Sequence, residues 1–273
     1  MGDRACVALT ELRREDARKL RDYMLASDKK GGGKLSPSSV QREIKIMSAV
    51  VTLGIKEFDL TNKAHNPFEK LEIKGSEEDA PSNGDIALRD PLPAAVIVAM
   101  RKKLKGDLLH IWRVLDGTGC RLAEITGLRT EDVVTGGDLP HIRVHWHTSR
   151  RLKTPASIRE VPLVGDALSA AVEALVLSKG AAVLFPRYAR DGGPTATSAA
   201  LMKHLRQITT DKRQTVHSLR HNMKDRLRTA KVPKDVQDLV LGHSAKGAGE
   251  RFYGSAGGKL GVAMRAMQEI VWD

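Results

Sequence analysis

The segment 75–88 constrains the fold of this chain more than any other stretch. It reads GSEEDAPSNGDIAL and combines four acidic residues, no basic residue, and the Gly, Pro, Ser and Asn that are typical of linkers. A chain of 273 residues is long enough to form a separate core on each side of such a linker. We therefore expect a helical domain at 1–75, a linker at 76–89 and a second domain at 90–273.

The charge balance points to the kind of partner. The chain has 45 Lys and Arg residues against 33 Asp and Glu residues, which gives a formal net charge of +12 at pH 7. Because the linker contributes only negative charge, the two domains are more basic than the chain as a whole. This balance favours a polyanionic partner, with double-stranded DNA as the leading candidate, over a basic protein without a special partner.

Cysteines and apolar runs indicate the compartment. Cys6 and Cys120 lie far apart and form no CxxC pair, so they suggest neither a disulfide framework nor a cysteine-rich zinc site. The apolar run 94–100 ends at Arg101 and is far shorter than the roughly 20 residues that span a membrane. Charges throughout the first 25 residues also argue against a signal peptide. We expect a cytoplasmic protein without a membrane partner.

The first domain is predicted to be helical. Residues 8–26 alternate charged and apolar positions at helical spacing, and a second helix follows Ser36 and Pro37, which suit a helix start. Arg42 and Lys45 lie opposite the apolar stripe of the second helix, where they either follow DNA or are simply solvated. The predicted stripe comprises Val40, Ile44, Met47 and Val51.

The second domain is predicted to be mainly α with a small antiparallel β-sheet, an α+β arrangement. Two β-like segments, 141–146 and 158–163, are joined by a basic connection that reads as a charged hairpin. A terminal stripe of Leu260, Met264, Met267 and Val271 must be buried, either on its own domain or on a neighbouring protomer. Helical spacing predicts the remaining elements at 92–105, 107–115, 120–128, 166–178, 198–208, 217–230 and 234–241.

Two short motifs carry a family resemblance. The stretch 118–124, TGCRLAE, resembles the first signature of the tyrosine recombinase, or phage integrase, family, and 217–221, HSLRH, resembles its second. Lys153 on the basic hairpin, His243 after Gly242, and Tyr253 in the sequence RFY complete the family's chain order. The resemblance covers about residues 90–255 and, more weakly, the N-terminal region, where Asn66, Pro67 and Phe68 resemble the end of a core-binding domain.

The resemblance implies a fold and an activity. It implies a helical core-binding domain followed by a tyrosine recombinase catalytic domain. The implied activity is site-specific recombination through a 3′-phosphotyrosyl intermediate, for integration or excision of a phage or mobile element. It also implies a homotetramer on DNA.

The chemistry explains why two arginines are wanted. Displacing a DNA strand builds negative charge on the phosphate, and a planar, permanently charged guanidinium can grip two phosphate oxygens. Arg121 and Arg220 are the candidates. Glu124, three residues after Arg121, permits a plain surface ion pair as the alternative, and we favour an arrangement in which Glu124 aims Arg121.

The histidines are assigned to proton handling and hydrogen bonding. His217 and Arg220 are three residues apart and project from one helix face. His217 is the candidate for proton transfer at the tyrosine hydroxyl, because an imidazole titrates near neutrality. His243 is the candidate hydrogen-bond donor to a non-bridging phosphate oxygen.

Lys153 is the preferred proton donor to the departing 5′ oxygen. The following residues, with Ser157, Arg159 and a VPL sequence, resemble the family's hairpin pattern. Arg150, Arg151 and Arg159 are nearby rivals, and a lysine that only neutralises phosphate is the simpler alternative.

Tyr253 is the expected nucleophile. The chain has two other tyrosines, Tyr23 in the first predicted helix and Tyr188 in a basic turn, and only Tyr253 follows His243. A phosphotyrosyl ester keeps the free energy of the broken bond available for religation without ATP.

Three alternatives are weighed against this interpretation. His217 and His221 have the HxxxH spacing of zinc ligands, but Ser218 stands where a metalloprotease has glutamate. A metal-dependent nuclease needs clustered carboxylates near the basic motifs, and the sequence shows none there. A purely DNA-binding regulator does not need all six residues, so their presence speaks against it. We therefore expect no metal and no cofactor. Asn222 and Met223 depart from the family's usual residues after the second motif.

Overall fold

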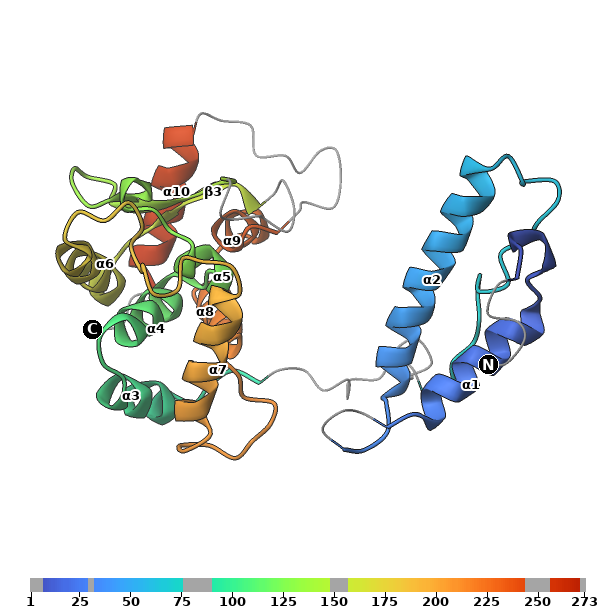
Figure 1. The fold of residues 1–273 in the computed structure, drawn as a ribbon. Coiled ribbons are helices and arrows are strands. Elements are labelled where there is room, and N and C mark those ends of the chain that lie inside the picture. The colour runs from blue at the N-terminus through green and yellow to red at the C-terminus, as the bar shows by residue number, and fades with distance from the viewer. Residues whose placement is uncertain (1–6, 29–31, 76–89, 148–156, 244–255, 271–273) are drawn as a thin grey trace. The chain divides into compact units, whose positions relative to one another are not determined.

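The computed structural model describes residues 7–28, 32–75, 90–147, 157–243 and 256–270. The chain divides into two units, residues 1–87 and 88–273 (Figure 1). Each unit has its own hydrophobic core. Among the described residues, no helix is long and apolar enough to cross a membrane.

The N-terminal unit is built on two α-helices. A short 3-10 helix, η1 (Leu9–Glu11), precedes α1 (Arg14–Ala26) and α2 (Pro37–Glu57). Ser36 begins α2 as expected, because its Oγ accepts a hydrogen bond from the Ser39 N–H at 3.2 Å. The small core consists of Ala17, Val40, Ile44, Phe68, Leu71 and Ile73.

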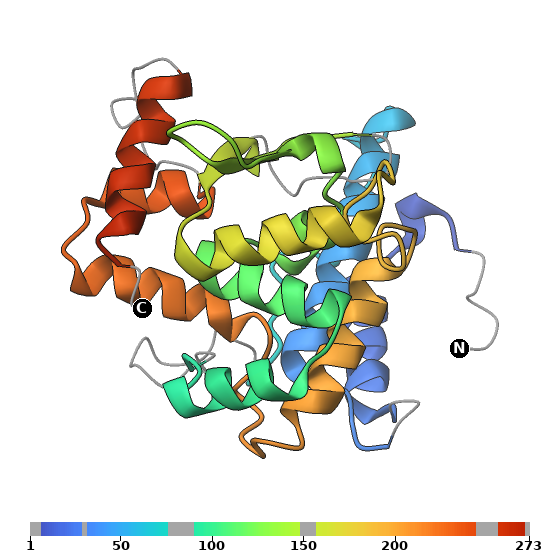
Figure 2. The same cartoon turned by 90° about the vertical axis from the view of Figure 1, so that its left-hand side faces the viewer.

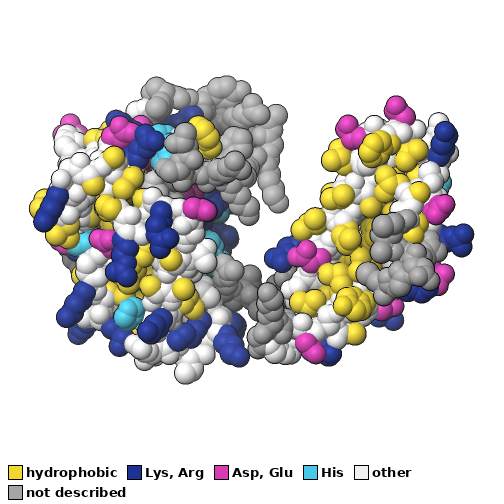
Figure 3. Space-filling view, viewed as in Figure 1, with side chains coloured by type: hydrophobic (Ala, Val, Ile, Leu, Met, Phe, Trp, Pro, Cys, Tyr) yellow, Lys and Arg dark blue, Asp and Glu magenta, His cyan; other side chains and the backbone are white. Residues whose placement is uncertain are grey.

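The predicted apolar stripe of α2 was only partly correct. Val40 and Ile44 are buried, but 41% of Met47 is exposed, because α1 and the 68–73 segment cover only one side of α2. Beside Met47, a second apolar row of Ile46, Val50 and Leu53 is also exposed. Figure 3 shows hydrophobic side chains gathered on this unit.

The C-terminal unit packs its helices around one core. In Figure 2, α4 and α6 lie side by side, and Trp112 and Ile111 of α4 are fully buried in that core. The helices run as α3 (Ala94–Lys103), α4 (Asp107–Thr118), α5 (Leu122–Thr126), η2 (Thr130–Asp132), α6 (Gly165–Ser178), α7 (Gly193–Leu205), α8 (Ser218–Thr229), α9 (Lys234–Leu241) and α10 (Ala256–Gln268).

A three-stranded antiparallel sheet lies in this unit, in the order β1-β2-β3. Its strands are β1 (Val133–Val134), β2 (His141–Val144) and β3 (Arg159–Pro162). Val144 pairs with Arg159 in the β2–β3 register, which fixes the base of the predicted hairpin. The predicted fold class, mainly α with a small antiparallel sheet, is confirmed. The strand β1 was not predicted, because two residues are too short to show an alternating pattern.

The terminal helix α10 packs on its own unit. Met264 and Met267 are buried in the core of this unit, and Leu260 is 5% exposed, whereas Val271 lies outside the described residues. The helix α10 contacts β3 and α9. The described residues of the apolar stripe are therefore covered within the chain.

Candidate active site

Two helix ends meet at the candidate site. Helix α4 ends at Gly119 with φ of +63°, and α9 ends at Gly242 with φ of +64°, both in the left-handed conformation that glycine adopts without strain. The last carbonyl groups of a helix have no partner within that helix and carry partial negative charge. The two ends therefore offer carbonyl acceptors to a shared cation.

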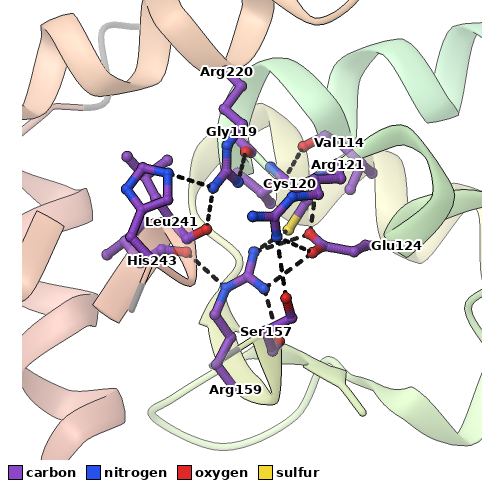
Figure 4. A network of polar contacts seen from close by, with 12 residues as sticks. Val114, Gly119, Cys120, Arg121, Glu124, Ser157, Arg159, Arg220, Leu241 and His243 are labelled. Carbon is purple, nitrogen blue, oxygen red and sulfur yellow. Dashed lines mark hydrogen bonds and ion pairs between the residues drawn. The ribbon is translucent and has the colours of Figure 1, made fainter. Parts of the chain in front are cut away.

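Arg220 on α8 supplies that cation. Its Nη1 donates to the Gly119 carbonyl at 2.9 Å, and its Nη2 donates to the Leu241 carbonyl (Figure 4). Burial, together with the nearby charges of Arg121 and Arg159, lowers the pKa of Arg220 to about 10. The side chain is thus anchored by both helix ends inside a region with excess positive charge.

His243 lies next to Arg220. Its Nε2 is 3.0 Å from Nη2 of Arg220, and its Nδ1 is 3.2 Å from Oδ1 of Asp238 on α9. Burial lowers the pKa of His243, and the charge of Arg220 adds to that effect, while Asp238 opposes it. The turn after α9 therefore places the predicted histidine directly against the second predicted arginine.

Arg121 is held by Glu124, as the sequence suggested. Nη1 of Arg121 donates to Oε1 of Glu124 at 2.8 Å, and its backbone N–H donates to Oε2 at 2.8 Å. Arg121 thereby begins α5, and 26% of its side chain stays exposed. The guanidinium is anchored on one side and accessible on the other.

Arg159 is the site residue whose role the sequence interpretation missed. It was considered as a rival to Lys153 and as part of the hairpin pattern, yet its side chain is 2% exposed and pairs with Glu124 at 3.0 Å. The available signal was the alternation of Arg159 with Val161 and Leu163 in the predicted strand, which places an arginine on the inward face, where a charge needs a buried partner. A solvent-facing role in proton donation does not fit this burial.

The second motif places His217 at the start of α8. His217 is exposed, and its ring meets that of His221 edge to face, with centroids 5.4 Å apart. The Arg220 N–H donates to the His217 carbonyl at 3.0 Å, so both residues share the first turn of α8. Lys153 and Tyr253 lie outside the described residues. Within the described ranges, no group of three His, Cys, Asp or Glu side chains is arranged to hold a metal ion.

The two unusual residues after the second motif have packing roles. Asn222 bonds the backbone of Leu92 twice, accepting from its N–H at 2.8 Å and donating to its carbonyl at 2.8 Å. Met223 is buried against Gly119, at the end of α4. These residues fasten α8 to the start of the C-terminal unit and to the helix end that Arg220 binds.

The sequence model described as the phage integrase family matches residues 94–255, which is more than half of the chain. That range contains every residue of the candidate site. No curated protein sequence matches this chain.

Solved structures share the fold. The integrase of the Tn1549 transposon, in complex with transposon right end DNA, has 18% identity and a TM-score of 0.58, over 96% of this chain and 86% of that chain. The lambda integrase tetramer bound to a Holliday junction has 14% identity and a TM-score of 0.60, over 88% and 66%. The XerH site-specific recombinase bound to a palindromic difH substrate has 15% identity and a TM-score of 0.53, over 87% and 67%.

Proposed function

Because this chain belongs to the phage integrase family and is a site-specific tyrosine recombinase, we propose that it cleaves and rejoins DNA through a covalent link to Tyr253. The observation that carries the proposal is the convergence of Arg121, Arg220 and His243 around two helix ends. Arg121 and Arg159 both bond one carboxylate, Glu124, and the charge of Arg220 lies nearby, so the site has a surplus of positive charge. A phosphodiester in its transition state supplies the missing negative charge.

The proposed reaction is a transesterification. The Tyr253 oxygen attacks the phosphorus, the bond from phosphorus to the 5′ oxygen breaks, and a 3′-phosphotyrosyl link forms. His217 takes the proton of the tyrosine hydroxyl, and Lys153 gives a proton to the leaving 5′ oxygen. The free 5′ hydroxyl of a partner strand then attacks the phosphotyrosyl link and releases Tyr253.

The two arginines stabilise the developing negative charge, and His243 helps to orient the phosphate. Arg121 and Arg220 bind the non-bridging oxygens, where negative charge grows as the tyrosine attacks. His243 donates a hydrogen bond to one of the same oxygens. These roles need no metal ion or cofactor, because fixed cations of the chain neutralise the phosphate.

The partner is double-stranded DNA, bound by both units. We assign residues 1–75 to a core-binding domain, 76–89 to a linker and 90–273 to the catalytic domain. Figure 3 shows Lys and Arg side chains spread over α3 and α7 of the C-terminal unit, which suits a polyanion. The lambda integrase structure is a tetramer on a Holliday junction, which supports a homotetramer on DNA for this chain. Its place of action is the cytoplasm, in the integration or excision of a phage or mobile element.

A suicide substrate tests the proposal. A nicked DNA that loses a short fragment on cleavage traps the covalent complex, which denaturing electrophoresis resolves as a protein-DNA band. The parent chain is expected to give this band, and Tyr253→Phe is expected to bind the same DNA without giving it, because only the attacking oxygen is lost. A full yield of adduct from Tyr253→Phe overturns the assignment of the nucleophile.

The same assay separates the alternatives. Cleavage that disappears in EDTA and returns with magnesium supports a metal-dependent nuclease instead. DNA binding without any covalent band, across a library of candidate sites, supports a regulator that has the fold without the chemistry.

A further inference from the structure

Arg159 is charged and buried, yet the proposed chemistry gives it no task. It starts β3, and its guanidinium lies between α5 and the end of α9 (Figure 4). We propose that Arg159 is a positioning residue that fixes Arg121 through Glu124, an inference that rests on the proposed function of Arg121. It does not touch the substrate.

Backbone carbonyls hold Arg159 in place. Its Nε donates to the carbonyl of Val240 in α9 at 2.9 Å, and its Nη1 donates to the carbonyl of Ser157 at 2.9 Å. Because the guanidinium is planar, two fixed acceptors on different sides leave it little freedom to rotate. The remaining N–H groups are therefore aimed by the backbone of α9 and of the residues before β3.

Those N–H groups point at Glu124. Nη2 of Arg159 donates to Oε2 at 3.0 Å, and Nη1 reaches Oε1 at 3.4 Å. Burial raises the pKa of Glu124, but the charge and hydrogen bonds of Arg159, together with those of Arg121, outweigh it and bring the pKa to about 2. Glu124 is thus kept ionised in a position where only 3% of the residue is exposed.

Glu124 in turn fixes the position of Arg121. Its two oxygens accept the Nη1 and the backbone N–H of Arg121, each at 2.8 Å. Without Arg159, the buried carboxylate has only the partly exposed Arg121 as its cationic partner, and Glu124 is free to protonate or turn away. The order of Arg121 therefore depends on a residue that never reaches the phosphate.

Gly242 supplies a second sign that this position is built for Arg159. A Cβ atom at Gly242 would lie 2.7 Å from Nη1 and 2.9 Å from Cζ of Arg159. Because the guanidinium of Arg159 packs against this position, a side chain larger than hydrogen does not fit before His243. The glycine therefore both forms the turn that ends α9 and leaves space for Arg159.

A double-mutant cycle tests the coupling. We measure single-turnover cleavage of the suicide substrate at saturating DNA, and DNA affinity by gel shift, for Arg159→Met, Glu124→Gln and the pair. Arg159→Met is expected to slow cleavage by about 10- to 100-fold with little change in affinity, by analogy with the range seen for residues that orient metal ligands. In the Glu124→Gln background the same change is expected to cost little more. An equal loss in both backgrounds overturns the proposal.

Two further variants guard against a folding defect. The paired variant removes both buried charges, and Arg159→Lys keeps the charge, so both are expected to fold even where Arg159→Met does not. Lysine cannot reproduce the planar fork that joins two carbonyls and a carboxylate, so Arg159→Lys is also expected to cleave slowly. Cleavage by Arg159→Lys at the parent rate overturns the proposal.

Arg113 offers a matched control. Its side chain is 14% exposed and bonds two carboxylates, Asp166 at 2.7 Å and Glu173 at 2.6 Å, both on α6 and away from the site. Arg113→Met is expected to lower the Tm but to leave the cleavage rate of the bound complex unchanged. If it slows cleavage as much as Arg159→Met, the effect of Arg159 is general destabilisation and the proposal is wrong.

A measurement on the free chain separates this inference from the proposed function. NMR relaxation of the Arg121 side-chain N–H groups reports their order without DNA. Arg159→Met is expected to lower that order, and Arg113→Met is not. If the parent chain forms no covalent adduct, the proposed function fails while this result still stands. Unchanged order of Arg121 in folded Arg159 variants overturns the positioning role whatever the chemistry.

Discussion

Nη2 of Arg220 lies 3.0 Å from Nε2 of His243, so the second arginine of the site and its histidine form one hydrogen-bonded unit. An arginine can only donate, and Nε2 must therefore accept, which leaves the proton of the neutral imidazole on Nδ1, facing Asp238. A hydrogen bond from His243 to a phosphate oxygen needs the proton on Nε2 instead. The proposed hydrogen bond from His243 to phosphate therefore requires Nε2 to give up its contact with Arg220.

This relationship predicts the titration of His243. Burial and the charge of Arg220 lower its pKa, so an NMR titration of the free chain is expected to give a midpoint below 6.5. Arg220→Met is expected to raise that midpoint, because it removes a neighbouring positive charge, while Arg220→Lys, which keeps the charge, is expected to leave it low. A midpoint at or above 6.5 in the parent chain contradicts the geometry.

The same pKa fixes the sign of a pH effect on stability. Between the lowered pKa and 6.5, the unfolded chain binds more protons at His243 than the folded chain does. The contribution of His243 is therefore present above pH 6.5 and is lost as the pH falls through this window. Thermal melting of the parent and of His243→Asn across these pH values checks the direction, and a parent that gains stability relative to the variant on acidification is the opposite result.

Arg121→Ala and Arg220→Ala are expected to reduce cleavage far more than DNA affinity. Removing one preorganised donor to a developing charge costs roughly 100- to 1000-fold in rate, whereas many other basic residues contribute to binding. Single-turnover cleavage and gel shifts on the same substrate measure the two effects. If a variant binds DNA more weakly but the bound complex cleaves at the parent rate, that arginine contributes to DNA binding and not to the chemical step.

The two arginines are expected to differ in stability. Arg220→Ala leaves the buried carbonyls of Gly119 and Leu241 without their donor, which costs about 1–3 kcal/mol for each unsatisfied group. Arg121 is partly exposed, and Glu124 retains Arg159, so Arg121→Ala is expected to lower the Tm less. Equal loss of Tm in the two variants speaks against the buried role of Arg220.

Gly119→Ala is expected to destabilise the chain and to slow cleavage. The added Cβ would lie 2.6 Å from Cγ of Met223 and 2.7 Å from its Cβ, and φ is +63°. Crowding in a packed core costs about 1–3 kcal/mol beyond the backbone strain, and any shift moves the carbonyl that holds Arg220. Gly106→Ala is the control, because Gly106 has φ of +55° and open space around it. Equal destabilisation of the two variants, measured by denaturant unfolding, shows that crowding at Met223 is unimportant.

Met267→Ala is expected to destabilise the C-terminal unit in the absence of DNA. Met267 is fully buried in the core of that unit, and truncating a buried methionine costs about 2–5 kcal/mol. Val176→Ala on α6, where 73% of the valine is exposed, is the matched apolar control with little expected effect. If Met267→Ala unfolds at the same denaturant concentration as the parent, α10 does not cover its own unit in solution.

The site was predictable wherever its residues interact over short distances along the chain. The three-residue spacing of Arg121 and Glu124 fits one helical turn, and the structure shows the expected ion pair. The proximity of Arg220 and His243 was expected only from the family's order of motifs, since 23 residues separate them. The contact between Arg159 and Val240 joins residues 81 positions apart, and no local pattern indicates it.

The sequence by itself determined the mainly helical fold with its small sheet, the family and the residue types of the site, because apolar spacing, glycine caps and short motifs are local properties. Only the tertiary structure decided which charges share a buried carboxylate, which carbonyls Arg220 takes and where the stripe of α10 is covered. Burial changes the free energy of every charge, and burial depends on how segments far apart in the chain pack together. Arg159 has the same guanidinium as every other arginine of the chain, and its place among Val240, Ser157 and Glu124 gives it a different role.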